Sequence, residues 1–232
     1  MVSKIAIVIQ ARCSSQRLPN KVILPFYKHQ SILEIIIKRL KSLEIPIIVA
    51  TSINESDDEI EFISKKNNCE CFRGDEENVM SRFISISNYY NLDFLIRVCA
   101  DNPFINVRLI EKLIRENILY KSYDYISHYI DNETPSIRSH LGIFSELIST
   151  NALNIINSKT NQTLYLEHVS NYIYENDKYF KIKKIKIPKL LKNKSKLRFT
   201  VDDKIDFEIM SDIYNNLEEN TYTLWNRLCK ST

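Results

Sequence analysis

The amino-acid sequence predicts an α/β protein built on a mostly parallel β-sheet. In the first half of the chain, short β-branched runs alternate with segments of amphipathic helical periodicity, the pattern of repeated strand–helix–strand units. A length of 232 residues, with 44% hydrophobic and 26% charged residues, is that of an ordinary globular chain. The alternation then breaks down. We therefore predict one domain over 1–232, with a mixed-sheet insertion at about 125–195 that could form a subunit interface.

The first half contains four predicted strands, each followed by a predicted helix. The first strand, 4–10, is a continuous apolar run, as expected for a strand buried on both faces. Ser31 and Glu34 form a capping box at the start of the first helix, and Ser56 and Glu59 form the same motif in the second. The strands are predicted at 4–10, 45–51, 69–72 and 94–98, and the helices at 31–43, 55–68, 76–90 and 106–119.

The second half mixes strands and helices in a less regular order. A strand at 180–187 alternates lysine with isoleucine, which predicts a half-buried strand with a solvated basic face. The alternative is that this face steers an anionic substrate towards the protein. The other predicted elements are strands at 123–128, 143–149 and 197–201 and helices at 163–176 and 204–219.

Glycine is nearly absent, because only Gly74 and Gly142 occur in the whole chain. Neither a Rossmann fingerprint nor a Walker A loop is therefore present, since both need several closely spaced glycines. If this protein binds a phosphate, side chains and helix N-termini must hold it.

Charge and cysteine content exclude several other classes. A net charge of +3 is too small for bulk nucleic-acid binding, and no apolar run approaches the roughly 18 residues of a membrane span. The five cysteines show no Cys-x-x-Cys spacing, so neither a zinc site nor a disulfide framework is indicated. We expect a cytoplasmic protein with reduced thiols that binds neither nucleic acid nor membrane.

A cluster of cations follows the first predicted strand. Arg12, Arg17 and Lys21 lie within ten residues, together with the hydroxyl groups of Ser14 and Ser15. Arginine can bind phosphate oxygens in a bidentate manner, and lysine adds a point charge. This loop therefore predicts a polyanion site built from side chains; the alternative is a solvated loop with incidental charge.

Two acidic residues follow other predicted strands. Asp101 comes after the strand at 94–98, and Asp202 comes after the strand at 197–201. Ligands of parallel sheets bind at the carboxyl ends of the strands, where the two acids could share one Mg²⁺ with substrate phosphates. The alternative for Asp202 is an N-cap of the following helix. Together with the cations, these acids predict a metal-assisted nucleotide site.

Six segments together resemble one enzyme family. The string IQARCSSQRLPNKV (9–22) is similar to the opening motif of cytidylyltransferases that activate acidic sugars. That group includes the CMP-Kdo and CMP-sialate synthetases and the spore-coat-polysaccharide cytidylyltransferase-like proteins, which the chain resembles most. The resemblance extends from about residue 4 to 218. The other matching segments are VATSINESDDEI, FRGDEENVMSRF, RVCADNPFI, EHVSNYIYEN and LRFTVDDKIDFEIMSDIY.

The resemblance implies a Rossmann-like nucleotidyltransferase fold, which is a GT-A-like three-layer sandwich. It implies roles for individual residues of this chain. It also implies transfer of CMP from CTP to a hydroxyl of a small anionic sugar or sugar-like acid, Mg²⁺ as cofactor, and a homodimer. The implied catalytic residues are Arg12, Arg17, Lys21 and Asp101. The implied nucleotide-binding residues are Gln10, Ala11, Arg12, Ser14, Ser15, Lys21, Thr51, Ser52, Arg73, Cys99 and Ala100. The implied Mg²⁺ ligands are Asp101 and Asp202, and the implied acceptor-binding residues are His140, Glu167 and His168.

The chain departs from the family pattern beside the predicted metal ligands. Ala100 replaces a common glycine, and Cys99 stands where the family often has glutamine or threonine next to the base. The choice of base therefore stays open, as does the acceptor: a ulosonic acid, another sugar, or a phosphorylated or phosphonate compound. Two other functions are also open. One is a glycosyltransferase of related fold, which would need an Asp-x-Asp pair at the position where this chain has the single acid Asp101. The other is a degenerate nucleotide-binding subunit that has lost catalysis.

Overall fold

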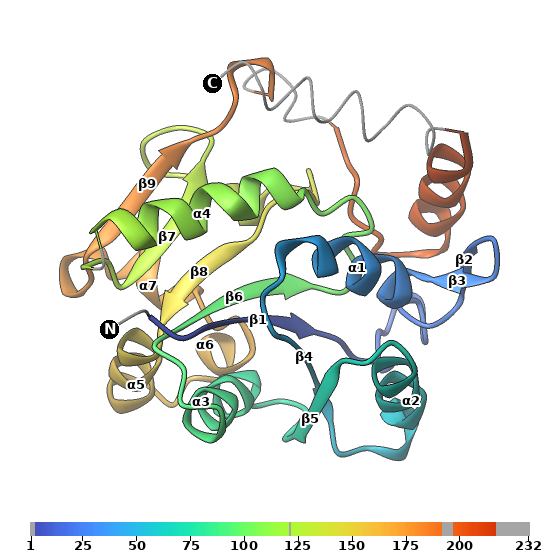
Figure 1. The fold of residues 1–232 in the computed structure, drawn as a ribbon, viewed down its shortest axis with the longest axis horizontal. Helices are drawn as coiled ribbons and strands as arrows, with labels where there is room; N and C mark the ends of the chain where they lie inside the picture. Colours follow the sequence, from blue (N-terminus) through green and yellow to red (C-terminus); the bar gives the residue numbers. More distant parts are fainter. Residues whose placement is uncertain (1–2, 121, 192–196, 217–232) are drawn as a thin grey trace.

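The computed structural model describes residues 3–120, 122–191 and 197–216. Within these ranges, seven strands form one sheet in the order β5-β4-β1-β6-β8-β7-β9 (Figure 1). A separate hairpin of β2 (Pro25–Tyr27) and β3 (Gln30–Ser31) lies between β1 and α1 in the chain. The strands of the large sheet are β1 (Ile5–Gln10), β4 (Ile47–Ser52), β5 (Glu70–Gly74), β6 (Phe94–Cys99), β7 (Tyr125–Tyr129), β8 (Glu146–Ser149) and β9 (Ile182–Lys186).

The first four strands of this sheet are parallel, as predicted. β1 pairs with β4 on one side and with β6 on the other, and β4 pairs with β5. Continuous apolar sequence is what a central parallel strand needs, because helices cover both of its faces. The carboxyl ends of these strands therefore meet at one edge, which carries the loops with the predicted site.

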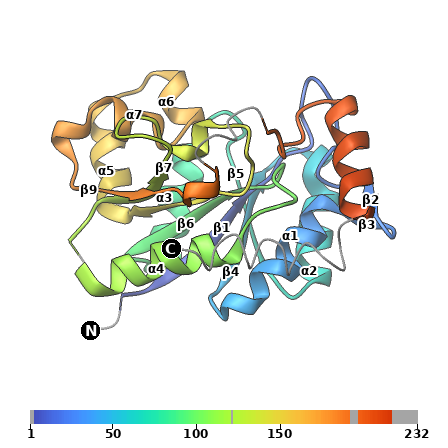
Figure 2. The same cartoon turned by 90° about the horizontal axis from the view of Figure 1, so that it is seen from above.

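Helices pack on both faces and make three layers, which confirms the predicted sandwich. Ile7 and Ile9 of β1 belong to a core shared with α1, α2, α4 and the helical residues 204–216, whereas Ala6 and Val8 pack with α3, α5 and α7. Figure 2 shows these two groups on opposite sides of the sheet. The α-helices are α1 (Ile32–Leu40), α2 (Asp58–Lys66), α3 (Val79–Tyr89), α4 (Val107–Tyr120), α5 (Thr150–Lys159), α6 (Thr163–Glu167) and α7 (Asn171–Glu175).

Short 3-10 helices extend or join these elements. They are η1 (Lys41–Leu43), η2 (Glu55–Asp57), η3 (Ser136–Arg138), η4 (Asp177–Tyr179) and η5 (Lys189–Leu191). None of the helices in the described ranges has both the length and the apolar character that crossing a membrane would require.

The insertion extends the main sheet with mixed strand directions. β8 runs antiparallel between β6 and β7, and β9 pairs with β7 in parallel at the edge. Two details differ from the sequence prediction. α5 was not predicted, and the helix predicted at 163–176 is two short helices, because the backbone at His168 (φ −105°, ψ 78°) leaves the helical region. The helix predicted at 204–219 is helical over 204–216, and the remainder lies outside the described residues.

The segment at 197–201 is extended but is not a strand of the sheet, so that prediction is wrong. Its Phe199 N–H donates to the His140 carbonyl (2.8 Å), and its Val201 N–H donates to the Asp101 carbonyl (2.9 Å). These acceptors lie in loops beyond the strand ends, so the segment has no neighbouring strand to pair with. It crosses the edge of the sheet that carries the site.

One of the two predicted capping boxes is present. Ser31 and Glu34 exchange both hydrogen bonds at the start of α1. Ser56 and Glu59 do not cap α2, because residues 55–57 form a 3-10 turn that places Asp57 at the N-cap position. The Asp57 carboxylate accepts hydrogen bonds from outside that helix, as described below.

Candidate active site

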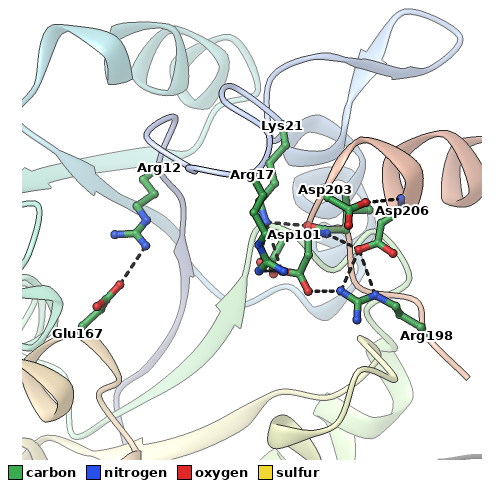
Figure 3. A network of polar contacts seen from close by, with 10 residues as sticks. Arg12, Arg17, Lys21, Asp101, Glu167, Arg198, Asp203 and Asp206 are labelled. Atoms are coloured by element: carbon green, nitrogen blue, oxygen red, sulfur yellow. Dashed lines mark hydrogen bonds and ion pairs between the residues drawn. The ribbon is translucent and has the colours of Figure 1, made fainter. Parts of the chain in front are cut away.

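The charged residues of the predicted site gather in two groups at the carboxyl edge of the sheet. Figure 3 shows Arg12 facing Glu167 at one end and Arg17 and Lys21 beside Asp101 at the other. The cations come from the loop after β1, Asp101 follows β6, and Glu167 ends α6. Residues that are up to 185 positions apart in the chain are in contact here.

Lys21 lies at the centre of the second group. Its ammonium Nζ is 3.1 Å from Asp101 Oδ2 and 3.9 Å from Asp202 Oδ1, and it donates to the Val201 carbonyl at 2.6 Å. The Lys21 side chain is only 9% exposed. A buried ammonium held by two carboxylates and a carbonyl is a fixed positive charge, and it joins the two acids that the sequence predicted to share a metal.

Asp202 belongs to this site and is not an N-cap. Arg17 donates to its Oδ1 at 2.8 Å, and Arg198 donates to its Oδ2. The N-cap of the helix over 204–216 is Asp203, whose Oδ1 accepts from the Asp206 N–H at 2.9 Å. The alternative interpretation of Asp202 as the N-cap is therefore wrong, because the N-cap is the next residue, Asp203.

Arg198 was missed by the sequence reasoning. Its Nε donates to Asp206 Oδ2 at 3.0 Å, and its guanidinium also reaches Asp202. Burial would raise the pKa of Asp206, but hydrogen bonds from Arg198 and from the Asp202 N–H outweigh burial and lower the pKa. The signal in the sequence that could have indicated Arg198 was its spacing, four residues before Asp202 and eight before Asp206.

The first group joins a predicted nucleotide residue to the predicted acceptor side. Arg12 donates to Glu167 Oε1 at 3.0 Å, and both side chains are partly exposed, at 40% and 35%. His168 follows Glu167 and is exposed, as is His140 in the loop before β8. His140 contacts the extended segment through its backbone carbonyl, to which the Phe199 N–H donates.

A buried carboxylate orders the loop after β1, and the sequence reasoning missed it. Asp57 accepts from the Cys13 N–H (2.7 Å), the Thr51 hydroxyl (2.8 Å) and both the N–H and the hydroxyl of Ser52. Burial alone would raise the pKa of Asp57, but these hydrogen bonds together lower it. Thr51 and Ser52, predicted to lie near the nucleoside, therefore use their buried hydroxyls to hold Asp57.

Arg73 is also occupied by contacts within the protein. Its Nε donates to the Ser52 carbonyl (2.9 Å), and its NH1 pairs with Asp58 (2.6 Å) and Glu61 (2.9 Å) of α2. These contacts tie the end of β5 to α2. Arg73 is adjacent to the predicted nucleoside residues, but its guanidinium faces the helix acids.

A buried network lies beneath the two groups. Arg97 pairs with Glu146 at 2.6 Å and donates to Gln10 Oε1 at 3.0 Å. Glu146 also accepts from the hydroxyls of Ser170 (2.7 Å) and Tyr125. The network connects the end of β1 to the turn after Glu167 and His168, so the nucleotide side and the predicted acceptor side share one rigid support.

The remaining predicted nucleotide residues line the ends of β1 and β6. The Ala100 N–H donates to the Gln10 carbonyl at 3.0 Å, and the Ala11 N–H donates to the Ala50 carbonyl at 3.0 Å. Burial raises the pKa of the Cys99 thiol to about 11, so Cys99 is a neutral thiol at neutral pH. Ser14 is exposed and Ser15 is half-buried in the cation loop.

The acid pair fits Mg²⁺ by its donor chemistry. Asp101 and Asp202 approach the same ammonium group, so a cation is already held between two carboxylates from separate segments. Groups of three or more His, Cys, Asp or Glu that could hold a metal do not occur in the described part of the chain. Mg²⁺ commonly binds one or two carboxylates and completes its shell with phosphate and water oxygens, which this pair would allow.

A family model described as cytidylyltransferase matches residues 6–227. The chain is 35% identical over 217 residues to the uncharacterized protein MJ1063 of Methanocaldococcus jannaschii, covering 93% of this chain and 85% of that protein. It is 29% identical over 225 residues to the spore coat polysaccharide biosynthesis protein SpsF of Bacillus subtilis, covering 94% and 89%.

Solved structures share the fold. A cytidylyltransferase from Leptospira borgpetersenii superposes with a TM-score of 0.83 at 26% identity, over 92% of this chain and 87% of that one. A CMP:2-keto-3-deoxy-manno-octonic acid synthetase, solved in complex with CTP, gives a TM-score of 0.68 at 15% identity, over 91% and 98%. The predicted nucleotidyltransferase fold is thereby confirmed.

Proposed function

This chain belongs to the cytidylyltransferase family, and we propose that it transfers CMP from CTP to a hydroxyl group of a sugar or sugar-like acid, with release of pyrophosphate. The observation that carries the proposal is Lys21, whose ammonium lies between Asp101 and Asp202 at the carboxyl edge of the sheet. Relatedness to SpsF supports a role in making surface polysaccharide or another glycan.

The cations would act on the triphosphate. In the proposed reaction the acceptor oxygen bonds to the α-phosphorus, the bond from that phosphorus to the bridging oxygen of the β-phosphate breaks, and the hydroxyl proton is released. Lys21 is held in place by two carboxylates, Arg17 is exposed beside it, and Arg12 is partly exposed at the other end of the site. Fixed cations stabilise the charge that develops on departing pyrophosphate without having to reorganise.

Asp101 and Asp202 would hold Mg²⁺. When bound, the ion would withdraw charge from the phosphate oxygens and help to orient the triphosphate. In this structure Arg17 and Arg198 form ion pairs with Asp202, and Lys21 forms one with an oxygen of Asp101. The arginines would turn towards the phosphates while Lys21, which is buried, stays between the acids.

Glu167, His168 and His140 would bind the acceptor. Glu167 ends α6 on the far side of the site from Asp101, and His168 follows it in the chain. His140 lies in the loop that contacts the 197–201 segment. Histidine can hydrogen-bond a sugar hydroxyl when neutral and pair with an acceptor carboxylate when protonated. The CMP:2-keto-3-deoxy-manno-octonic acid synthetase with the same fold makes a keto sugar acid the first acceptor to test.

A nucleotide and acceptor screen tests the proposal. The protein is incubated with Mg²⁺, one of the four NTPs and a panel of acidic sugars and phospho-acids, while pyrophosphate release and product mass are measured. We expect pyrophosphate release with CTP that depends on the acceptor, and a CMP adduct of that acceptor. Acceptor-dependent release with UTP or ATP in preference to CTP, or no adduct with any acceptor, would contradict the proposal.

We further propose that the protein is cytoplasmic, as its cysteine pattern indicates, and that it is a homodimer, as the family resemblance and the mixed-sheet insertion indicate. Sedimentation equilibrium of the full chain tests the oligomeric state. A mass near twice 27.4 kDa is expected, and a monomer at micromolar concentration would contradict it.

A further inference from the structure

Arg82 is a buried arginine whose charge is not paired. It lies in α3 and is 1% exposed, yet none of its three guanidinium nitrogens has a hydrogen-bond partner in the described part of the protein. Buried charges are normally paired, because removing a cation from water without a partner costs several kcal/mol. Arg97 is the contrast within this fold, since it is equally enclosed but bonds to Glu146 and Gln10.

The charges that act on Arg82 come from the candidate site and from Asp75 and Glu76, which precede α3. After burial itself, the group that most lowers the pKa of Arg82 is the cation of Arg12, and the largest opposing influence is Asp57. Both oxygens of Asp57 are already occupied by Cys13, Thr51 and Ser52. The charge of the predicted triphosphate loop thus acts on Arg82, whose guanidinium donors are all unused in the described part of the protein.

One of the two glycines makes room for this side chain. A Cβ atom at Gly74 would lie 2.7 Å from Arg82 Cγ and 3.4 Å from Cδ, which is closer than the stem allows. Gly74 ends β5 at the site edge and does not have a positive φ, so space and not backbone conformation requires glycine there. One of the two glycines of the chain therefore lies where the Arg82 side chain packs against the end of β5.

We propose that Arg82 is a nucleotide-binding residue, whose guanidinium donates hydrogen bonds to an acceptor oxygen of bound CTP, either on a phosphate or on the cytosine ring. This inference rests on the proposed function. The guanidinium is buried, so binding requires a neighbouring side chain to move, and we infer that this is Arg12, whose charge acts on Arg82. Arg12 is partly exposed and is held by the ion pair with Glu167, and such pairs are weak.

Titration calorimetry on Arg82→Met and Arg82→Lys tests the proposal without requiring turnover. We expect Arg82→Met to weaken CTP binding by about 10- to 100-fold, the range of a hydrogen bond to a charged group. Arg82→Lys should recover part of that loss, and Arg115→Lys on the exposed face of α4 should bind as the wild type does. Pyrophosphate and cytidine, titrated separately, identify whether the contact is to phosphate or to the base.

Thermal unfolding separates binding from a structural role. Because the cation is unpaired, Arg82→Met should leave the melting temperature of the free protein unchanged or higher, while the stabilisation by CTP is lost. Gly74→Ala, which displaces the Arg82 stem, should reduce CTP binding in the same direction. A lower melting temperature with unchanged CTP affinity would overturn the inference, since Arg82 would then be structural. Absence of CTP binding by the wild type would instead overturn the proposed function.

Discussion

At the scale of single residues, every predicted triphosphate cation already has an acidic partner. Arg12 pairs with Glu167, Arg17 with Asp202, and Lys21 with Asp101. The two arginine pairs are partly exposed and therefore weak, whereas the lysine pair is largely enclosed. The phosphates of CTP would compete with Glu167 and Asp202 for the arginines. Lys21 would keep its position and its contacts with the acids.

Asp101→Asn tests the metal and lysine contacts together. Its carboxylate is partly exposed and bonds to one side chain, Lys21, so we expect the fold to survive the change. Pyrophosphate release should fall by at least about 10²–10³-fold, the loss seen when a comparable transition-state contact is removed. Asp131→Asn is the matched control, because that exposed carboxylate accepts hydrogen bonds from its near neighbours Glu133 and Thr134. Near-normal turnover of Asp101→Asn would contradict the assignment.

Glu167→Gln tests whether Glu167 restrains Arg12. The change removes the carboxylate that competes with phosphate, so the KM for CTP should fall, by at most about fivefold for a partly exposed pair. The KM for the acceptor should rise if Glu167 also contacts it. Glu175→Gln is the control, since Glu175 contacts only the Tyr165 hydroxyl in α6. Identical KM values for both substrates would show that the ion pair is incidental.

Some site residues could be predicted from the sequence because their role is local. Arg12, Lys21 and Asp101 stand in polar loops directly after apolar runs, where strand ends place ligands. Asp57 and Arg82 could not be found this way. Asp57 is one of several acids at the start of a helix, and Arg82 is one of several polar residues within a helix. Both are buried by tertiary packing, which the local sequence does not indicate.

At the scale of secondary-structure elements, the two halves of the chain differ in how well they could be predicted. The central parallel strands are buried on both faces, so their sequences are mostly apolar and easily recognised. The segment 197–201 alternates apolar and polar residues as a strand does, but its main chain bonds to loops and not to a strand. Whether an extended segment joins a sheet depends on its neighbours, which the local sequence does not specify.

Asp57→Asn tests the connection between the loop after β1, the end of β4 and the start of α2. An amide NH2 would place its own donors against donor groups that Asp57 now accepts from, of which there are four. We expect the free energy of unfolding at neutral pH to fall by about 2–3 kcal/mol, measured by urea denaturation. The neighbouring Asp58→Asn, which breaks an exposed pair with Arg73, should cost less than about 1 kcal/mol.

The stabilisation that Asp57 provides should depend on pH, and the same variant measures this dependence. Hydrogen bonds lower the pKa of Asp57 below its usual 3.8, so its contribution to stability is complete above about pH 3.8. That contribution is lost as the pH falls further, through the pKa of the folded state. The difference in unfolding free energy between wild type and Asp57→Asn should therefore shrink below pH 3.8. A difference that is constant down to pH 2 would show that charge is not the cause.

At the scale of the whole molecule, one sheet joins the nucleotide half to the predicted acceptor half. β6 carries Asp101 at its end and pairs with β8, which supplies the buried Glu146. Glu146 in turn holds Ser170, next to the turn that carries Glu167 and His168. Strand pairing and a buried polar network, and not a flexible hinge, would thus set the distance between the two proposed substrates.

This continuity predicts that both halves unfold together. Native-state hydrogen exchange in increasing urea, read by mass spectrometry, compares peptides from β6 (Phe94–Cys99) with peptides from β8 (Glu146–Ser149) and β7 (Tyr125–Tyr129). Because β8 is hydrogen-bonded to both other strands, their amides should exchange through one global opening with the same dependence on urea. If β7 and β8 exchanged through a separate opening of lower free energy, the insertion would be an independent unit, and the sheet could not fix the spacing between nucleotide and acceptor.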